Sequence, residues 1–300
     1  MFKAFQAIFG ALVLTVSLSA YGQTMTITTA KGEQTLAGKP ETMVVFDLLS
    51  LDTLDALGVT LKAKPNNLKL DYIDNFVANP VSIGTSSQPN YENIVKMNPD
   101  LIVVGGGSSR LMKPLSAIAP TIDMYVSSGD YVAQMLSRLE NFALITATQE
   151  RGEQLKQAFL SKLTQAQSAV QGKGKTLIVM TNGNKLSTFG LKSRFGWLFS
   201  DVGLVPAMTN IDPKSHGESI SFEYIAKVDP DYLLVVDRAA AIGRQSQAAA
   251  VTLDTPLVKQ TKAGKAGNII YLTPGPAYVT GSAYQGMNTV LDELIAAYGD

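Results

Sequence analysis

The chain has 300 residues, of which 46% are hydrophobic and 17% are charged, which describes a folded globular protein with enough core for two domains. Lysine and arginine number 25, as do aspartate and glutamate, so the chain lacks the overall positive charge that nucleic acid or anionic membrane would attract. It contains no cysteine, which excludes disulfides, thiolate metal sites, a cysteine nucleophile and a lipidated N-terminal cysteine. The only histidine is His216, so a multi-histidine metal site is excluded as well.

Residues 1–22 are predicted to be a secretory signal peptide. Lys3 gives a positive start, residues 7–20 form an uncharged run, and the small residues Ala20 and Gly22 precede the expected cleavage point. A membrane anchor is the alternative, but the run is short for a bilayer span and no cluster of charges follows it. We therefore expect cleavage before Gln23 and a periplasmic protein that is not a lipoprotein.

From residue 23 to residue 147 the sequence predicts an N-terminal α/β lobe. The expected elements, in chain order, are a hairpin at 25–36, a strand at 43–46, a helix at 48–57, a strand at 81–84, a helix at 91–97, a strand at 101–104, a strand at 121–126 and a helix at 131–146. A glycine-rich loop at 105–110 follows the strand at 101–104.

A polar stretch then predicts one long, exposed connecting helix over 148–171. Apolar residues recur in it at helical spacing, at Leu155, Phe159, Leu163 and Ala166. A second α/β lobe is expected over 172–300. Its elements are strands at 177–180 and 186–189, helices at 197–202 and 222–228, strands at 232–236 and 268–272, and a closing helix at 283–297.

An internal repeat supports the division into two lobes. Residues 91–104 and 222–235 match at Glu, Lys, Pro, Asp and Val, and each copy predicts a helix stopped at a proline and then an apolar strand. Such strands are typical of a parallel sheet covered on both faces. An arginine follows each strand, Arg110 in one copy and Arg238 in the other. Because open α/β sheets bind ligands at the carboxyl ends of their strands, both arginines are predicted to face a cleft between the lobes.

The chain resembles the periplasmic ferric-siderophore binding proteins of ABC importers, and most closely those for ferric catecholates of the enterobactin type. The likeness covers the two α/β lobes, the long helix and the segments 91–104, 193–196, 216–220, 229–238 and 275–281. It implies two Rossmann-like lobes joined by one long rigid helix, and a monomer that delivers its ligand to an inner-membrane ABC permease. It also implies no intrinsic cofactor, because Fe(III) is carried within the siderophore.

Three arginines are the predicted ligand-binding residues. A ferric catecholate is a compact polyanion with aromatic rings, and arginine offers both a permanent positive charge and a planar face. The resemblance implies that Arg110, Arg194 and Arg238 form a basic floor beneath the iron complex. The alternative is that each forms an ordinary surface salt bridge.

The resemblance also implies that His216 and Tyr278 complete the coordination of Fe(III) when the siderophore offers only four donors. His216 lies in a polar loop, which argues against a place in the core, and the prolines and glycines around Tyr278 place it at the carboxyl end of a strand. A phenolate oxygen is a hard donor suited to Fe(III), and imidazole nitrogen is an acceptable one. Under a siderophore with six donors, both residues would only contact the complex, and a solvent-facing histidine with no role is the remaining alternative.

Glu92 and Glu223 occupy the same place in the two copies of the repeat, each in the first turn of a helix. A favourable interaction with the helix dipole is a sufficient explanation for such acids. The resemblance implies a further role, in which one acid on each lobe pairs with arginines of the permease.

Rival functions have less support in the sequence. The loop at 105–110 lacks the Gly-Lys-Ser/Thr end of a P-loop, and the chain has no Gly-x-Ser-x-Gly elbow, so a nucleotide-binding protein or a hydrolase is disfavoured. Phe195 and Trp197 are interpreted as core residues. We expect a binding protein with no catalytic residues; the same fold binding a hydroxamate siderophore or haem stays open as the alternative.

Overall fold

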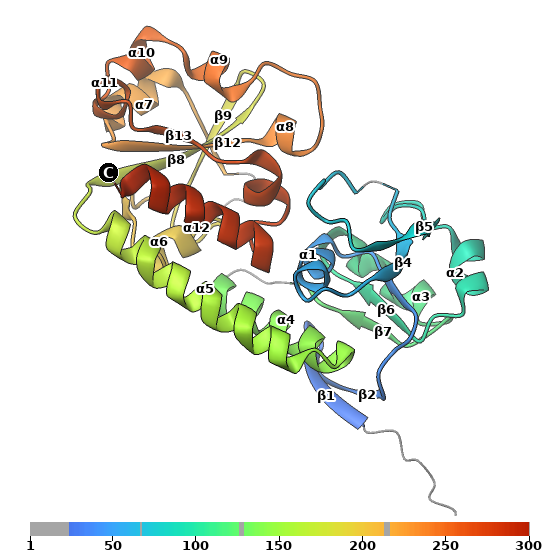
Figure 1. The fold of residues 1–300 in the computed structure, drawn as a ribbon. Coiled ribbons are helices and arrows are strands. Elements are labelled where there is room, and N and C mark those ends of the chain that lie inside the picture. The colour runs from blue at the N-terminus through green and yellow to red at the C-terminus, as the bar shows by residue number, and fades with distance from the viewer. Residues whose placement is uncertain (1–23, 67, 126–128, 213–216, 300) are drawn as a thin grey trace, which may run out of the picture.

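The computed structural model describes residues 24–66, 68–125, 129–212 and 217–299. It consists of two α/β lobes, with the helix α5 (Gln149–Val170) running along one side of both (Figure 1). The predicted signal peptide and His216 lie outside the described residues. Within the described ranges, no helix is both long enough and apolar enough to cross a membrane.

The N-terminal lobe is built on a three-stranded parallel sheet with β6 in the middle, between β3 and β7. Its strands are β3 (Met43–Val45), β6 (Leu101–Val104) and β7 (Thr121–Asp123), and its helices are α1 (Leu48–Ala56), α2 (Tyr91–Met97), the 3-10 helix η1 (Gly106–Leu111), α3 (Met112–Leu115) and α4 (Tyr131–Thr146). An antiparallel hairpin, β1 (Thr24–Thr29) and β2 (Gly32–Ala37), and a parallel pair, β4 (Leu61–Lys64) and β5 (Phe76–Ser82), complete it. The sequence analysis did not predict β4.

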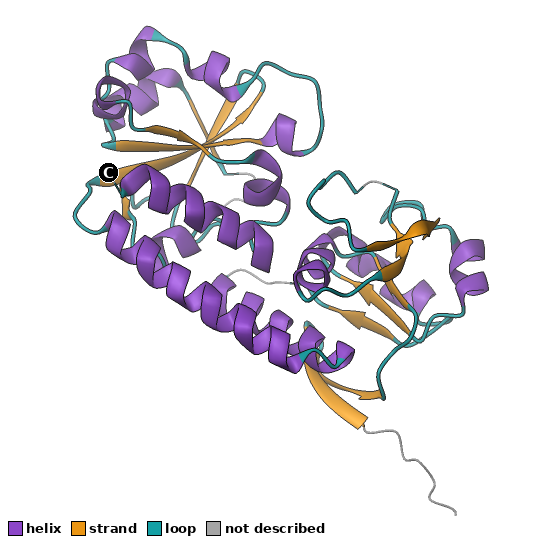
Figure 2. Cartoon of the chain, in the orientation of Figure 1, coloured by secondary structure: helices purple, strands orange, loops and turns teal. Residues whose placement is uncertain are grey.

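The C-terminal lobe is built on a six-stranded sheet in the order β11-β9-β8-β12-β13, with β10 also paired to β8. The strands are β8 (Lys175–Asn182), β9 (Lys185–Phe189), β10 (Val205–Pro206), β11 (Glu218–Ile220), β12 (Tyr232–Asp237) and β13 (Ile269–Tyr271). The helices are α6 (Trp197–Ser200), α7 (Phe222–Val228), α8 (Arg238–Ala241), α9 (Ala249–Leu253), α10 (Pro256–Lys259), α11 (Lys262–Ala266), the π-helix η2 (Gly275–Val279) and α12 (Tyr284–Tyr298). Helices lie on both sides of the sheet (Figure 2).

The central strands of both lobes are covered on both faces, as the repeat predicts. Along β12, Leu234 and Val236 belong to one hydrophobic cluster, whereas the alternate residues Leu233 and Val235 belong to another. The strand β6 divides its residues between two clusters in the same way. Because successive side chains of a strand point to opposite faces, fully apolar strands are what such a position requires.

The two copies of the repeat have the same local structure. Helices α2 and α7 each have seven residues, and their amino ends are capped by the side chains of Asn90 and Ser221. Each ends at a left-handed residue, Asn98 or Asp229, both with a φ of 45°. The sequence analysis assigned this stop to the prolines that follow; in the structure the chain has already left the helix one residue before them.

One hydrophobic cluster extends through both lobes. It includes residues of α1 and α4 in the first lobe, of α5, and of β8, β12 and α12 in the second. Leu155, Phe159, Leu163 and Ala166 of α5 are all buried in it, so the helix predicted as exposed covers the core with one face.

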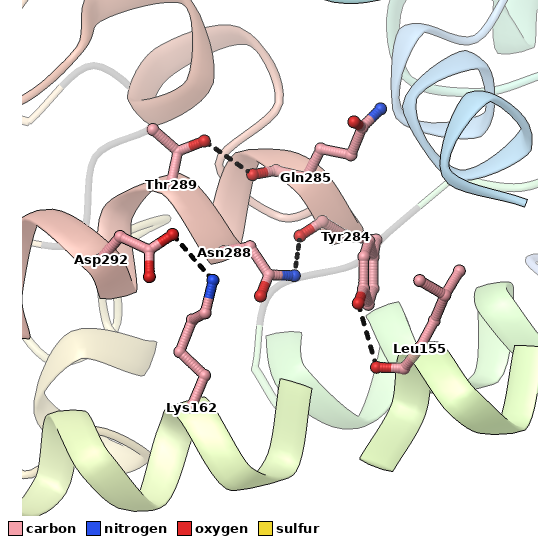
Figure 3. A network of polar contacts seen from close by, with 7 residues as sticks. All are labelled: Leu155, Lys162, Tyr284, Gln285, Asn288, Thr289 and Asp292. Atoms are coloured by element: carbon pink, nitrogen blue, oxygen red, sulfur yellow. Dashed lines mark hydrogen bonds and ion pairs between the residues drawn. The ribbon is translucent and has the colours of Figure 1, made fainter. Parts of the chain in front are cut away.

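Polar contacts also fasten α5 to α12. The Lys162 ammonium lies 2.7 Å from the carboxylate of Asp292, and the Tyr284 hydroxyl donates to the carbonyl oxygen of Leu155 at 3.0 Å (Figure 3). The long helix is thus an integral part of the C-terminal lobe as well as the link between the lobes.

Candidate functional site

Two of the predicted arginines meet at Tyr278 in the C-terminal lobe. Nη2 of Arg194 donates to the carbonyl oxygen of Tyr278 at 2.6 Å, and its guanidinium carbon lies 4.5 Å from the centre of the tyrosine ring. Nε of Arg238 donates to the hydroxyl oxygen of the same tyrosine at 2.8 Å, with its guanidinium carbon 5.5 Å from the ring centre. We call these three residues the Arg–Tyr–Arg cluster. All three are half-buried.

A tight turn between β9 and α6 places Arg194. The amide of Gly196 donates to the carbonyl of Ser193 at 2.8 Å, and a Cβ on Gly196 would lie 2.1 Å from the carbonyl oxygen of Leu191, so the turn requires glycine there. The neighbouring Phe195 is buried and packs edge-on against another core ring at 4.9 Å between centres. The arginine is therefore held between a fixed turn and a buried anchor.

The end of β12 places Arg238 as the first residue of α8. The preceding Asp237 caps this helix, because its carboxylate accepts from the amides of Ala240 at 3.0 Å and Ala249 at 2.9 Å. Tyr278 comes from the π-helix η2, a form of helix that occurs often at functional sites. The carboxyl end of a strand was predicted at this tyrosine from the prolines and glycines around it; the chain instead forms the π-helix after β13 has ended at Tyr271.

Within the part of the chain that the structure describes, no acid forms an ion pair with the cluster. Burial lowers the pKa of Arg194, the interactions with Tyr278 and Tyr131 oppose that effect, and the like charge of Arg238 reinforces it. Among the described residues, no carboxylate lies within 4.0 Å of the guanidinium of Arg194, Arg238 or Arg110. The surface salt bridges considered in the sequence analysis are therefore not formed within this part of the chain. Two adjacent, unpaired cations are suited to an anion.

Arg110 lies in the N-terminal lobe and does not join the cluster. It is exposed at the end of η1, and its Nη2 donates to the carbonyl oxygen of Ser86 at 3.0 Å. The segment predicted as a loop at 105–110 forms most of η1. The neighbouring Ser109 ties this 3-10 helix to β7, because its hydroxyl donates to Oδ1 of Asp123 at 2.9 Å.

Two tyrosines of the N-terminal lobe were missed by the sequence analysis. Burial raises the pKa of Tyr131, and the charge of Arg194 opposes this while Tyr125 adds to it, so Tyr131 lies within electrostatic range of Arg194 in the other lobe. Tyr125 is 53% exposed at the carboxyl end of β7. Its amide donates to Oδ1 of Asp123 at 3.0 Å, the atom that also holds Ser109. Tyr131 could have been found from the sequence, because it begins a helix that follows a predicted parallel strand, where ligand-binding residues often lie.

The remaining predicted site residues, His216, Glu92 and Glu223, are not part of the cluster as the structure describes it. His216 lies outside the described residues, so its relation to the cluster is a prediction. Glu92 and Glu223 are both exposed, in the first turns of α2 and α7, which lie far apart in the molecule (Figure 1). Glu92 lies 2.5 Å from the ammonium of Lys96. A hydrogen bond from Ser221 lowers the pKa of Glu223.

A cavity of about 380 Å³ lies beside Tyr125, in the N-terminal lobe. It is lined by residues of β1, of the end of β7 and of α4, among them Arg138, and its lining includes no residue of the Arg–Tyr–Arg cluster. Pockets are commonly the first candidates for ligand sites. In this protein the unpaired charge and the aromatic ring of the Arg–Tyr–Arg cluster are stronger evidence for a ligand site than this cavity is. The cluster lies in the C-terminal lobe, away from the cavity.

Comparisons with known proteins show the family and the fold of this chain. Residues 43–276 match the family model described as periplasmic binding protein, and the chain belongs to this family. The petrobactin-binding protein YclQ of Bacillus subtilis is 31% identical, over 97% of this chain and 98% of its own. The ferric-anguibactin-binding protein FatB of Vibrio anguillarum is 28% identical, over 89% and 85% of the two chains.

Solved structures show the same two-lobed fold. The crystal structure of YclQ superposes with a TM-score of 0.84 at 29% identity, covering 93% of this chain and 99% of that one. The catecholate-siderophore binding protein VctP of Vibrio cholerae superposes with a TM-score of 0.79 at 30% identity, covering 91% and 100%. The predicted fold class, two α/β lobes with a long helix between them, is confirmed.

Proposed function

We propose that this protein captures a ferric catecholate siderophore between its lobes and delivers it to an inner-membrane ABC permease. The observation that carries the proposal is the Arg–Tyr–Arg cluster, in which two cations share one aromatic residue and have no carboxylate partner among the described residues. A ferric catecholate supplies the matching anionic charge and the planar rings that guanidinium and tyrosine faces contact well.

Relatives of this chain support the choice of ligand class. Similar proteins are named as binders of petrobactin, ferric anguibactin and a catecholate siderophore, and one solved structure holds ferric iron with two acinetobactin molecules. A relative that is 27% identical is named as a binder of ferric citrate, an anion without aromatic rings. All of these are binding proteins, which favours a transport role without catalysis.

The test is a set of titrations followed through the fluorescence of Trp197, the only tryptophan, which is buried a few residues after Arg194. A ferric bis-catecholate and a ferric tris-catecholate should quench it at the lowest concentrations. Ferric citrate should bind more weakly, because it has the charge without the rings. A neutral ferric hydroxamate that bound as tightly as the catecholates would contradict the proposal.

We also propose that Arg110 and the two tyrosines of the N-terminal lobe, Tyr125 and Tyr131, contact the ligand opposite the cluster. Asp123 holds both Tyr125 and the segment of Arg110 through one carboxylate oxygen, so these side chains share a rigid support at the end of β7. The charge interaction between Tyr131 and Arg194 supports the view that the two lobes face each other here.

Direct ligation of iron is proposed for Tyr278 and His216 when the siderophore has only four donors. The hydroxyl oxygen of Tyr278 accepts one hydrogen bond, from Arg238, and retains a second lone pair for a metal ion. No intrinsic cofactor is invoked, since the iron is part of the cargo.

Docking to the permease is proposed for Glu92 and Glu223, and export for the chain as a whole. The equivalent positions of the two acids, one on each lobe, support recognition by a permease with two similar halves. We propose that residues 1–22 are removed on export and that the protein acts as a monomer without a lipid anchor. Mass spectrometry of the exported protein should find Gln23 at its N-terminus.

A further inference from the structure

The segment that follows Tyr278 in the C-terminal lobe is held by side chains of the N-terminal lobe. The hydroxyl groups of Tyr72 and Thr280 lie 2.5 Å apart, and the Tyr72 hydroxyl donates to Oδ2 of Asp52 at 3.0 Å. When Asp52 is ionised and accepts from Tyr72, the Thr280 hydroxyl is the donor to Tyr72. Thr280 therefore has a partner in the other lobe only two residues after the tyrosine of the cluster.

The helix that follows this segment also depends on the N-terminal lobe. Helix α12 begins after Ala283, which has no side chain able to cap it. The buried carboxylate of Asp52 accepts from the amides of Gln285 at 2.8 Å and Gly286 at 3.2 Å, which are unpaired donors at the start of the helix. The amide side chain of Gln285 points away from α5 (Figure 3). It donates to the carbonyl of Asp52 at 3.1 Å and to the carboxylate of Asp55 at 2.8 Å. The other lobe thus supplies the cap.

Close packing connects these contacts to the cluster. A Cβ on Gly286 would lie 2.1 Å from the carbonyl oxygen of Thr280, so the start of α12 and the segment before it are in backbone contact. A Cβ on Gly275, the first residue of η2, would lie 3.0 Å from Cδ2 of Leu70 in the N-terminal lobe. The π-helix that carries Tyr278 therefore lies close to the N-terminal lobe at both ends, with Gly275 beside Leu70 and Thr280 hydrogen-bonded to Tyr72.

We propose that Tyr72 and Asp52 are positioning residues for the Arg–Tyr–Arg cluster. They fix the segment 280–286 and with it the place of Tyr278, whose carbonyl and hydroxyl oxygens receive Arg194 and Arg238. Ligand affinity then depends on a hydrogen-bonded contact between the lobes that the ligand itself does not touch. This inference rests on the proposed function, in so far as the cluster binds the ligand.

The test in binding is a double-mutant cycle. Tyr72→Phe keeps the ring and removes the hydroxyl, and it should weaken binding of a ferric catecholate by about three- to tenfold, the loss expected of one hydrogen bond. In a Tyr278→Phe background the same change should matter less than about twofold, because residues that act through one another are not additive. A purely structural role for Tyr72 predicts equal losses in both backgrounds.

The chain offers a matched control in a second tyrosine–threonine pair. The Tyr298 hydroxyl lies 2.9 Å from that of Thr176 and is more deeply buried than Tyr72, yet it does not contact the cluster. Tyr298→Phe should lower stability and leave the affinity unchanged. At the other partner, Thr280→Ser should keep the parent affinity, while Thr280→Val should reproduce the loss seen with Tyr72→Phe.

A measurement without ligand separates this inference from the proposed function. Hydrogen exchange of segment 275–286 should be faster in Tyr72→Phe than in the parent and in Tyr298→Phe. If the parent binds no ferric catecholate but exchange is faster, the proposed function fails and the positioning role stands. If the parent binds and neither exchange nor affinity changes in Tyr72→Phe, the positioning role is overturned and the proposed function stands.

Discussion

The three arginines should contribute unequally to ligand binding, because the structure holds them differently. Arg194 is half-buried, bonded to the Tyr278 carbonyl and in contact with its ring, so it is already desolvated and ordered before a ligand arrives. Removing its charge with Arg194→Gln should cost about 2–3 kcal/mol, or about 30- to 150-fold in Kd, as for a charge-assisted contact. Arg110 is exposed and bonded to one carbonyl, and Arg110→Gln should cost about 1 kcal/mol or less.

The assay is a fluorescence titration with a ferric catecholate at two concentrations of sodium chloride, near 0.15 M and near 0.5 M. Salt screens exposed charges more than buried ones, so the small contribution of Arg110 should vanish at the higher concentration while that of Arg194 persists. Arg244→Gln is the control and should leave the affinity unchanged, since Arg244 is an exposed arginine in the same lobe as Arg194. Equal losses for Arg110→Gln and Arg194→Gln, with equal dependence on salt, would refute the reasoning.

Three further predictions concern iron ligation, docking and pH. Tyr278→Phe and His216→Ala should each shift the visible charge-transfer band of a bound ferric bis-catecholate, and unchanged spectra would exclude direct ligation. Replacing Glu92 and Glu223 together by lysine should leave the siderophore affinity intact but stop uptake in cells; uptake at the parent's rate by the exported double variant would leave helix capping as the explanation. Burial raises the pKa of Asp52 from 3.8 to about 7, so the stability that its protonated form contributes is complete below 3.8 and is lost as the pH rises through about 7. The free energy of unfolding in urea, relative to Asp52→Asn, should therefore fall by up to about 1.4 kcal/mol per pH unit across that interval, and a flat difference would contradict the shift.

The elements that were predictable from the sequence are those specified by local patterns. The repeated helix–proline–strand unit predicted α2 with β6 and α7 with β12, because periodicity and turn residues act within a few positions of one another. The ends of the helices α2 and α7 were predicted less well. The left-handed Asn98 and Asp229 stop their helices before the prolines do, since a short polar side chain tolerates that conformation.

The site itself was only partly predictable, because it depends on contacts between distant parts of the chain. Arg194 and Tyr278 were singled out separately, but their hydrogen bond joins residues far apart in sequence, and no local pattern encodes it. Tyr131 was missed because its significance comes from the charge of Arg194, a residue of the other lobe, which acts on it. The role of Asp52 could not be predicted, because nothing near it in the sequence shows that its carboxylate accepts from the first amides of α12.

The hydrophobic cluster that continues from α1 and α4 through α5 to α12 means that neither half of the chain contains a complete core. Without the helix α12 (Tyr284–Tyr298), the faces of α4 and α5 that belong to this cluster would be partly uncovered. That helix also needs Asp52 to pair its first amides. Helix α12 thus completes a core that both lobes share, and a chain without Tyr284–Tyr298 should not form a stable fold.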